Sequence, residues 1–288
     1  MQTLETYTFN SHKEGINLLV LGAVHGNEPA GTLAIEKIMQ KLVQSQLSLK
    51  AGAITFIPVC NPAAKQENVR FVEHNLNRIL KKHDVETSLE HSYANQICKL
   101  IEKADYVLDL HSTPLDGDLP SVFNDFVDEE TSAWAESLNI GTVITSWRDM
   151  LKSGGVADEF SDTVFHAHNH GKKALLVEAG YHNEPTAEKL AYRAIEKTLN
   201  FFGMIEKENN EKAKEENTIA HMYKIVFKTE EQGEFVQDWK HMDPVSANQI
   251  IAKLENGTEL TAEQDGYIVI PFPEATVGEE WFYLARKN

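Results

Sequence analysis

Four residues of the chain are of types that together could hold a metal ion and activate water: His25, Glu28, His111 and Glu178. Two imidazoles and one carboxylate form the ligand set of a catalytic zinc ion, which keeps its fourth position for water. His25 and Glu28 are three residues apart in a tight turn, so both could reach one ion. A hydrolase also needs a carboxylate near the water as a base, and Glu178 is placed for that role. The four residues therefore predict a hydrolytic zinc site.

Each of these residues also has an ordinary explanation when it is considered alone. His25 and Glu28 could belong to a surface turn with a capping glutamate, His111 could be a core histidine with satisfied hydrogen bonds, and Glu178 could cap a helix. However, His25, His111 and Glu178 each directly follow an apolar run. Open α/β sheets bind their ligands at the carboxyl ends of the strands, and this shared position favours the zinc site.

Strands that are buried on both faces must position these side chains. Such strands read as short apolar runs, and the chain has four of them and one β-branched segment: 16–24, 53–59, 106–110, 174–177 and 142–146. Apolar residues at helical spacing predict helices from Pro29 to about residue 42, over 94–104, and from Pro185 to about residue 202. This alternation predicts an α/β layered domain over residues 1–206, with a mostly parallel mixed central sheet.

The pattern changes in the last third of the chain. Residues 205–217 are almost all Glu, Lys and Asn, which is typical of a solvated linker or helix tail. Beyond them, 222–227, 250–254 and 267–270 read as short strands separated by turn signals such as Asn-Gly and Asp-Gly. We therefore predict a small C-terminal β domain over residues 207–288.

The composition is that of a globular protein with an acidic balance. The chain has 288 residues, 42% of them hydrophobic and 25% charged, with a net charge of −17. This charge argues against a nucleic acid or an anionic membrane as partner. The N-terminus lacks the pattern of a signal peptide and no apolar run approaches membrane-spanning length, so we expect a cytoplasmic location. Cys60 and Cys98 lie in apolar stretches and are expected to be buried thiols.

Four short motifs resemble those of a known family. They are His25–Gly31, Asn75–Arg78, Asp109–Ser112 and Val177–Gly180, with the sequences HGNEPAG, NLNR, DLHS and VEAG. Together they resemble the motifs of the succinylglutamate desuccinylase/aspartoacylase family, a branch of the zinc carboxypeptidase-like hydrolases, and they stand in the family's order. The predicted C-terminal β domain is similar, more loosely, to the family's C-terminal half. The resemblance implies a zinc carboxypeptidase-like fold.

The resemblance also implies roles for the residues of the site. One Zn²⁺ ion per chain would be held by His25, Glu28 and His111, with Glu178 as general base and then general acid. Arg70 would polarise the scissile carbonyl and stabilise the oxyanion, a task suited to a fixed cation in a partly dry site.

For the substrate, the resemblance implies that Asn77 and Arg78 bind the α-carboxylate, which a guanidinium can hold in a bidentate fork. The alternative for Arg70 and Arg78 is that both are ordinary surface cations. The family has a C-terminal tyrosine that reaches the site. It matches Tyr283 here, although Phe282 aligns almost as well.

The chain departs from the family at one place. In aspartoacylase an arginine shortly before the base binds the side-chain carboxylate of the substrate, and here that place falls near His168, between His166 and His170. If this run were extended, its three imidazoles would share one face and could bind a metal ion; the alternative is a polar loop. Lys172 or Lys173 could supply a point charge instead. We therefore expect N-acetylaspartate to be a poor substrate, with acidic substrates favoured more below the usual pKa of histidine.

These observations predict a zinc-dependent hydrolase that cleaves the amide bond of an N-acyl amino acid or a similar small amide. One alternative is a zinc carboxypeptidase that acts on peptide C-termini. Another, from a different class, is a zinc-stabilised binding protein without turnover, against which Glu178 and Arg70 speak. The sequence leaves open the acyl group, the amino acid and the formation of a homo-oligomer.

Overall fold

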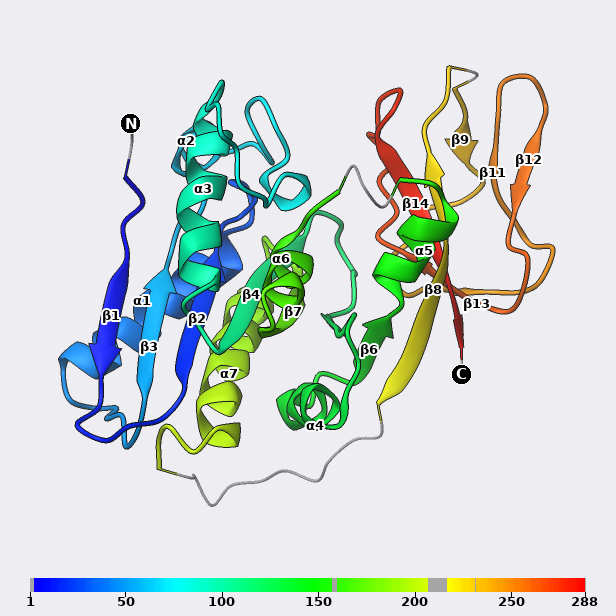
Figure 1. Ribbon diagram of the computed structural model, residues 1–288. Helices are drawn as coiled ribbons and strands as arrows, with labels where there is room; N and C mark the ends of the chain where they lie inside the picture. The colour runs from blue at the N-terminus through cyan, green and yellow to red at the C-terminus, as the bar shows by residue number, and fades with distance from the viewer. Residues whose placement is uncertain (1–2, 157–159, 207–216, 231, 288) are drawn as a thin grey trace.

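One large sheet runs through the molecule, and a smaller sheet packs at the end that the C-terminal strands form (Figure 1). The computed structural model describes residues 3–156, 160–206, 217–230 and 232–287. Within these residues the large sheet has eleven strands, in the order β1 (Tyr7–Asn10), β3 (Ala53–Ile57), β2 (Asn17–Gly22), β4 (Tyr106–Thr113), β7 (Lys173–Tyr181), β5 (Ser121–Phe123), β6 (Thr142–Thr145), β8 (Thr218–Phe227), β14 (Glu280–Lys287), β13 (Gly266–Val269) and β10 (Pro244–Val245). The smaller sheet consists of β12 (Glu259–Thr261), β11 (Ile250–Lys253) and β9 (Glu234–Phe235). This arrangement confirms the predicted fold class.

The centre of the large sheet is parallel. β3, β2, β4 and β7 run in the same direction, and nearly all residues of β2, β4 and β7 are buried, so these strands read as continuous apolar runs. β4 and β7 extend further than the apolar runs suggest. His111 and Glu178 therefore lie within the two strands rather than beyond their ends, and they are Cα partners in the ladder between them.

Helices cover both faces of this sheet (Figure 1). The helices on one face share a core with the strands and are α1 (Pro29–Val43), α4 (Glu129–Leu138) and α7 (Pro185–Phe201). The elements on the other face are the short helix α2 (Pro62–Glu67), the 3₁₀ turn η1 (Leu76–Arg78), α3 (Leu89–Ile101), α5 (Trp147–Ser153) and α6 (Thr163–Asn169). The predicted helices are thereby confirmed as α1, α3 and α7.

The C-terminal strands continue the large sheet. β8 pairs in parallel with β6, and β14, β13 and β10 follow in antiparallel order. The smaller sheet packs on this end through a core cluster that contains Trp239, Trp281 and Phe282. The predicted C-terminal strands are confirmed as β8, β11 and β13. The domain boundary predicted at residue 207 lies outside the described residues.

Two further expectations concern burial. Cys60 and Cys98 are buried free thiols, and burial raises the pKa of both, that of Cys98 to about 12. In the part of the chain that the structure describes, no helix combines the length and the apolar character needed to cross a membrane.

His241 connects the C-terminal part to the central layer. Its ring nitrogen Nδ1 accepts a hydrogen bond from the backbone of Ile270 at 3.1 Å, so Nε2 carries the proton and donates to Ser121 Oγ at 3.0 Å. The backbone N–H of His241 donates to Asp118 Oδ1 at 2.8 Å. The residue is 1% exposed, and burial lowers the pKa of the ring to about 3.

This buried ring predicts a loss of stability in acid. Its pKa in the folded state lies below the unfolded value of 6.5, so the contribution of His241 is fully present above pH 6.5 and is lost as the pH falls towards 3. Lowering the pH from 8 to 5 should reduce the contribution of His241 to the free energy of unfolding by about 2 kcal/mol. We expect His241→Asn to be less stable at pH 8 but to lose less on acidification, measured by urea denaturation of chelator-treated protein. An equal loss in both proteins would assign the effect to other groups.

Candidate metal centre and active site

The loop between β2 and α1 carries the first two predicted metal ligands. Ala23, two residues before His25, has a positive φ of 44°, a strained conformation where the chain leaves the strand. Gly26 is required by packing, because a Cβ atom there would lie 2.1 Å from the carbonyl carbon of Ala64. Glu28 directly precedes α1 but makes no capping hydrogen bond with its side chain. Its carboxylate is directed to the site instead.

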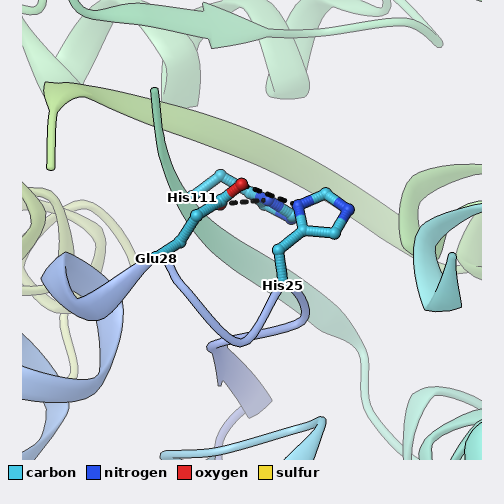
Figure 2. A group of neighbouring side chains, drawn as sticks. All are labelled: His25, Glu28 and His111. Carbon is cyan, nitrogen blue, oxygen red and sulfur yellow. Dashed lines mark hydrogen bonds and ion pairs between the residues drawn. The ribbon is translucent and has the colours of Figure 1, made fainter. Parts of the chain in front are cut away.

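His25, Glu28 and His111 converge on one buried point (Figure 2). Glu28 lies between the two rings, with Oε1 2.8 Å from His25 Nδ1 and Oε2 2.9 Å from His111 Nδ1. The candidate ligand atoms all lie within 4.8 Å of one another, and the three residues are between 1% and 3% exposed. The structure thus brings together the three residues that the sequence predicts as metal ligands.

The hydrogen bonds around the two rings fit a cation between them and Glu28. His25 Nε2 lies 3.0 Å from Asn75 Oδ1 and His111 Nε2 lies 3.0 Å from Asp109 Oδ2, so each ring has an acceptor on both sides. A neutral imidazole has one N–H and can donate to only one of them. When Nε2 of each ring donates this hydrogen bond to Asn75 or Asp109, both Nδ1 atoms face Glu28 with a lone pair. Such partners are what fix the tautomer of a metal-binding histidine.

The pKa shifts of His25, His111 and Glu28 also fit a cation bound between them. Burial, reinforced by Arg70, lowers the pKa of His25 to about 4, so this ring is neutral near pH 7. Burial opposes charge on His111, but Asp109 and Glu28 raise its pKa well above the usual value. Burial likewise opposes charge on Glu28, yet the two histidines hold its pKa well below the usual range. A metal ion bound here would take the place of the proton on His111.

Glu178 is a buried carboxyl group beside these three residues. It is 8% exposed, and its Oε2 has no hydrogen-bond partner among the described residues. Burial, and then the negative charge of Glu28, raises its pKa to about 8. Because it lies within β7, it does not cap a helix. A carboxyl group with a pKa near the working pH is suited to accept a proton and return it.

Arg70 is held beside the three candidate metal ligands, His25, Glu28 and His111. Its Nη1 donates to Glu28 Oε1 at 3.0 Å, and its backbone carbonyl accepts a hydrogen bond from Gly26 in the ligand loop. The side chain is 37% exposed and lines the cavity described below. The structure therefore places Arg70 at the site rather than on an unrelated surface.

Arg78 also lies at the site, but its fork is occupied. Nε donates to Glu280 Oε1 at 2.6 Å and Nη2 donates to Glu280 Oε2 at 2.7 Å, while Nη1 donates to the carbonyl oxygen of Asn77 at 2.8 Å. The guanidinium also lies 5.4 Å from the ring centres of Trp147 and Phe160. The guanidinium fork, which the resemblance assigns to a substrate carboxylate, thus holds an internal carboxylate from the C-terminal strand β14, and the binding of a substrate by Arg78 stays a prediction.

A cavity of about 380 Å³ opens beside the metal group. Its wall combines residues of the central layer with residues of the C-terminal part, including Phe227, Ile270 and Phe272. Two guanidinium groups and seven carboxyl groups line it; the carboxyl groups are those of Glu28, Asp125, Asp162, Glu178, Glu274, Glu279 and Glu280. The cavity is therefore acidic overall, even though both arginines face it.

The structure separates the two candidates for the C-terminal aromatic residue. Tyr283 lines the cavity, is 2% exposed, and packs against Trp147 with ring centres 4.8 Å apart. Phe282 belongs to the core cluster beneath the smaller sheet. Neighbouring residues of a strand point to opposite faces, which is why only one of the two reaches the cavity.

His168 does not reach the site. The run of three histidines is part of α6 and the turn after it, and His168 is an exposed residue stacked on Phe126 with ring centres 3.5 Å apart. From the segment before β7, the cavity receives Phe160, Asp162 and Val164 instead. Lys173 forms ion pairs with Asp128 and Glu130 and is not among the described lining residues. The expected place of His168 at the substrate is therefore corrected: the segment forms a helix, and its residue that lines the cavity is Val164.

Sequence reasoning did not single out several residues that support the site. Asp109 lies two residues before His111 on one strand, so its presence on the same face could have been read from strand periodicity. Its carboxylate also accepts a hydrogen bond from Thr163 Oγ1 at 2.5 Å, which links α6 to the metal group. Glu280, by contrast, is separated from Arg78 by 202 positions and carries no local signal.

Most of the chain is similar to a known protein family. A model of the succinylglutamate desuccinylase/aspartoacylase catalytic domain matches residues 14–205. A probable aspartoacylase of Acaryochloris marina is 30% identical over 104 residues, which cover 33% of this chain and 34% of that protein. The chain thus aligns with about a third of the length of this curated relative.

Two solved structures show the same fold over nearly the whole chain. The product-bound ectoine utilization protein of Ruegeria pomeroyi has a TM-score of 0.76 at 18% identity, covering 98% of this chain and 88% of the other. A succinylglutamate desuccinylase/aspartoacylase of Rhodobacter sphaeroides has a TM-score of 0.75 at 17% identity, covering 99% and 89%. At such identities the likeness shows the fold.

Proposed function

Because the chain belongs to the succinylglutamate desuccinylase/aspartoacylase family, we propose that it is a zinc-dependent hydrolase that removes the acyl group from an N-acyl amino acid or a similar small amide. The observation that carries the proposal is the buried group of His25, Glu28 and His111, with Glu178 beside it. This group opens on a cavity whose volume suits a small molecule rather than a long chain.

The residues divide the reaction between them. A zinc ion held by His25, Glu28 and His111 would lower the pKa of a bound water molecule and polarise a carbonyl group. The carboxylate of Glu178 accepts the proton of the attacking water and returns it to the nitrogen of the leaving amine. Arg70 donates hydrogen bonds to the carbonyl oxygen as negative charge develops on it.

The α-carboxylate of the substrate would compete with an internal group. Arg78 and Asn77 remain the proposed binding residues, and both line the cavity. Since the fork of Arg78 holds Glu280 in two hydrogen bonds, a substrate carboxylate must displace Glu280 to form the same contact. Glu280 therefore excludes substrates whose carboxylate binds Arg78 too weakly to displace it.

Acidic side chains on the substrate should be disfavoured. The cavity wall contains Asp162, from the segment before β7, and Asp125, whose charge interacts with it; the two carboxyl groups accept backbone hydrogen bonds from Phe165 and Arg148. A second substrate carboxylate placed there would lose its water and meet like charge. Burial raises the pKa of Asp125 to about 7, so this repulsion is strongest above pH 7 and weakens below it.

We therefore expect kcat/KM for N-acetylaspartate at pH 8 to be lower, by about tenfold or more, than for N-acetyl derivatives of neutral amino acids. The difference should shrink at pH 6, where Asp125 is protonated. In Asp125→Asn the difference at pH 8 should fall to the level of the wild-type protein at pH 6. A preference of the wild-type protein for N-acetylaspartate at pH 8 would contradict the assignment.

The function itself is tested with a panel of N-acetyl, N-succinyl and N-formyl amino acids and short peptides, assayed with zinc. Hydrolysis of the N-acyl amino acids with little cleavage of the peptides is the expected result. Preferential release of C-terminal residues from peptides would identify a carboxypeptidase. Tight binding of the panel compounds without turnover would identify a binding protein.

A further inference from the structure

A second cluster of ligand-type side chains lies away from the cavity, where α3 and α6 pack side by side on one face of the sheet (Figure 1). Glu102 is the C-cap residue of α3, His166 lies in α6, and His170 is the C-cap residue of α6. His166 Nε2 and His170 Nε2 lie 3.4 Å and 3.7 Å from the same oxygen, Glu102 Oε1. The ligand atoms of the three residues all lie within 4.8 Å of one another.

The hydrogen bond of the His170 ring leaves a lone pair at this point. His170 Nδ1 lies 2.9 Å from the backbone carbonyl oxygen of His166. A carbonyl can only accept, so Nδ1 carries the proton and Nε2 faces Glu102 with its lone pair. His166 is 6% exposed, and its Nε2 forms no hydrogen bond among the described residues. A buried polar atom needs a partner, and a cation bound between this nitrogen and Glu102 would supply one.

The spacing of the ligand atoms suits a metal ion better than direct hydrogen bonds. Distances of 3.4 and 3.7 Å are longer than good N–H···O hydrogen bonds. Ligands bound tetrahedrally to zinc at their usual bond lengths are about 3.3 Å from one another. Two histidines four residues apart on one helix face, joined by a carboxylate, are a known arrangement for such an ion.

We propose that Glu102, His166 and His170 form a second site for a divalent transition metal ion such as Zn²⁺, separate from the cavity. Glu102 and His170 are partly exposed, so water can complete the coordination and the site is weaker than the buried one. The ion would join the ends of α3 and α6. Since α6 begins with Thr163, which holds Asp109 beside His111, occupancy of the second site stabilises the support of the first.

The test is metal stoichiometry and thermal stability of the full-length chain in four forms. They are the wild-type protein, His170→Ala, Glu102→Gln and His168→Ala as the matched control from the same helix. In equilibrium dialysis against micromolar Zn²⁺, the wild-type protein and His168→Ala should bind one zinc ion more per chain than the other two. The extra ion should raise Tm by roughly 2–5 °C in these two forms alone.

The comparison depends on the difference between variants, so it does not require the cavity to hold zinc. Equal stoichiometry in the wild-type protein and His170→Ala would overturn the proposal. The same holds if His168→Ala loses the extra ion, because the site would then not be the one described. Titration with Ni²⁺ in place of Zn²⁺ should show the same pattern, since imidazole ligands suit both ions.

Discussion

His111→Ala should lose the metal ion of the cavity and with it nearly all hydrolytic activity. His111 is 1% exposed, sits on a central strand, and is held by Asp109 so that its Nδ1 faces Glu28. Alanine leaves two of three protein ligands and a buried carboxylate that has lost its neighbour. We expect zinc content below about a tenth of the wild-type level, and a fall in kcat of roughly 10³-fold or more, because the polarising ion is absent.

The measurement is elemental analysis after dialysis with one equivalent of Zn²⁺ per chain, with every form carrying His170→Ala so that the second site cannot take up the ion. His25→Ala should behave in the same way, and treatment with a chelator should abolish the activity of the wild-type protein. The matched control is His12→Ala, which removes an exposed histidine outside the motifs and outside the described cavity lining. Full zinc occupancy in His111→Ala would remove His111 from the ligand set.

The central strands could be predicted because their burial has a local signature. A strand covered by helices on both faces is apolar along most of its length, as β2 is and as β4 and β7 largely are before His111 and Glu178. β1 and β5 could not be recognised in this way, since β1 is a mostly exposed edge strand and β5 is only three residues long. β14 joins the sheet through pairing with β8, a long-range contact that no local pattern encodes.

The residues of the candidate site likewise differ in whether a local pattern reveals them. His25, His111 and Glu178 could be predicted because each follows a recognisable apolar run, and Glu28 because it shares a tight turn with His25; the parallel sheet brings such positions together. The pairing of Arg78 with Glu280 could not be predicted, because Glu280 comes from the other end of the chain and no local pattern reveals the contact.

His168 shows a different limit. Its position in the sequence suggested a place at the substrate, but the segment folds as a helix. A helix faces His166 and His170 the same way and turns His168 towards Phe126. Because the segment forms α6, His168 does not reach the cavity, and His166 and His170 come together beside Glu102.

Glu178→Gln should keep the metal ion but lose most of the hydrolytic activity. Glutamine has nearly the same size and shape as glutamate, so the packing of β7 and the three metal ligands should be preserved. It cannot accept a proton, however, and the water attack and the protonation of the leaving amine would both lack their proton carrier. We expect kcat to fall by roughly 10²-fold or more, with KM little changed and zinc content equal to that of the wild-type protein.

The pH profile distinguishes a proton carrier from a merely structural carboxylate. Burial and the charge of Glu28 raise the pKa of Glu178 to about 8, and a cation bound beside it would lower that value. Since the ionised form is the active one, kcat/KM of the wild-type protein should rise with pH and level off below about pH 8. In Glu178→Gln this ascending limb should be absent from the residual activity.

Two further variants separate position from charge. Glu178→Asp keeps a proton acceptor but withdraws it from the reacting atoms, so part of the activity and the ascending limb should remain. Glu274→Gln removes another carboxylate from the cavity wall and should change kcat by no more than about threefold, because only loss of the proton acceptor costs the full factor. Near-normal turnover in Glu178→Gln would mean that another group activates the water; Asp109 would be the first to test, since it is buried and already bound to His111.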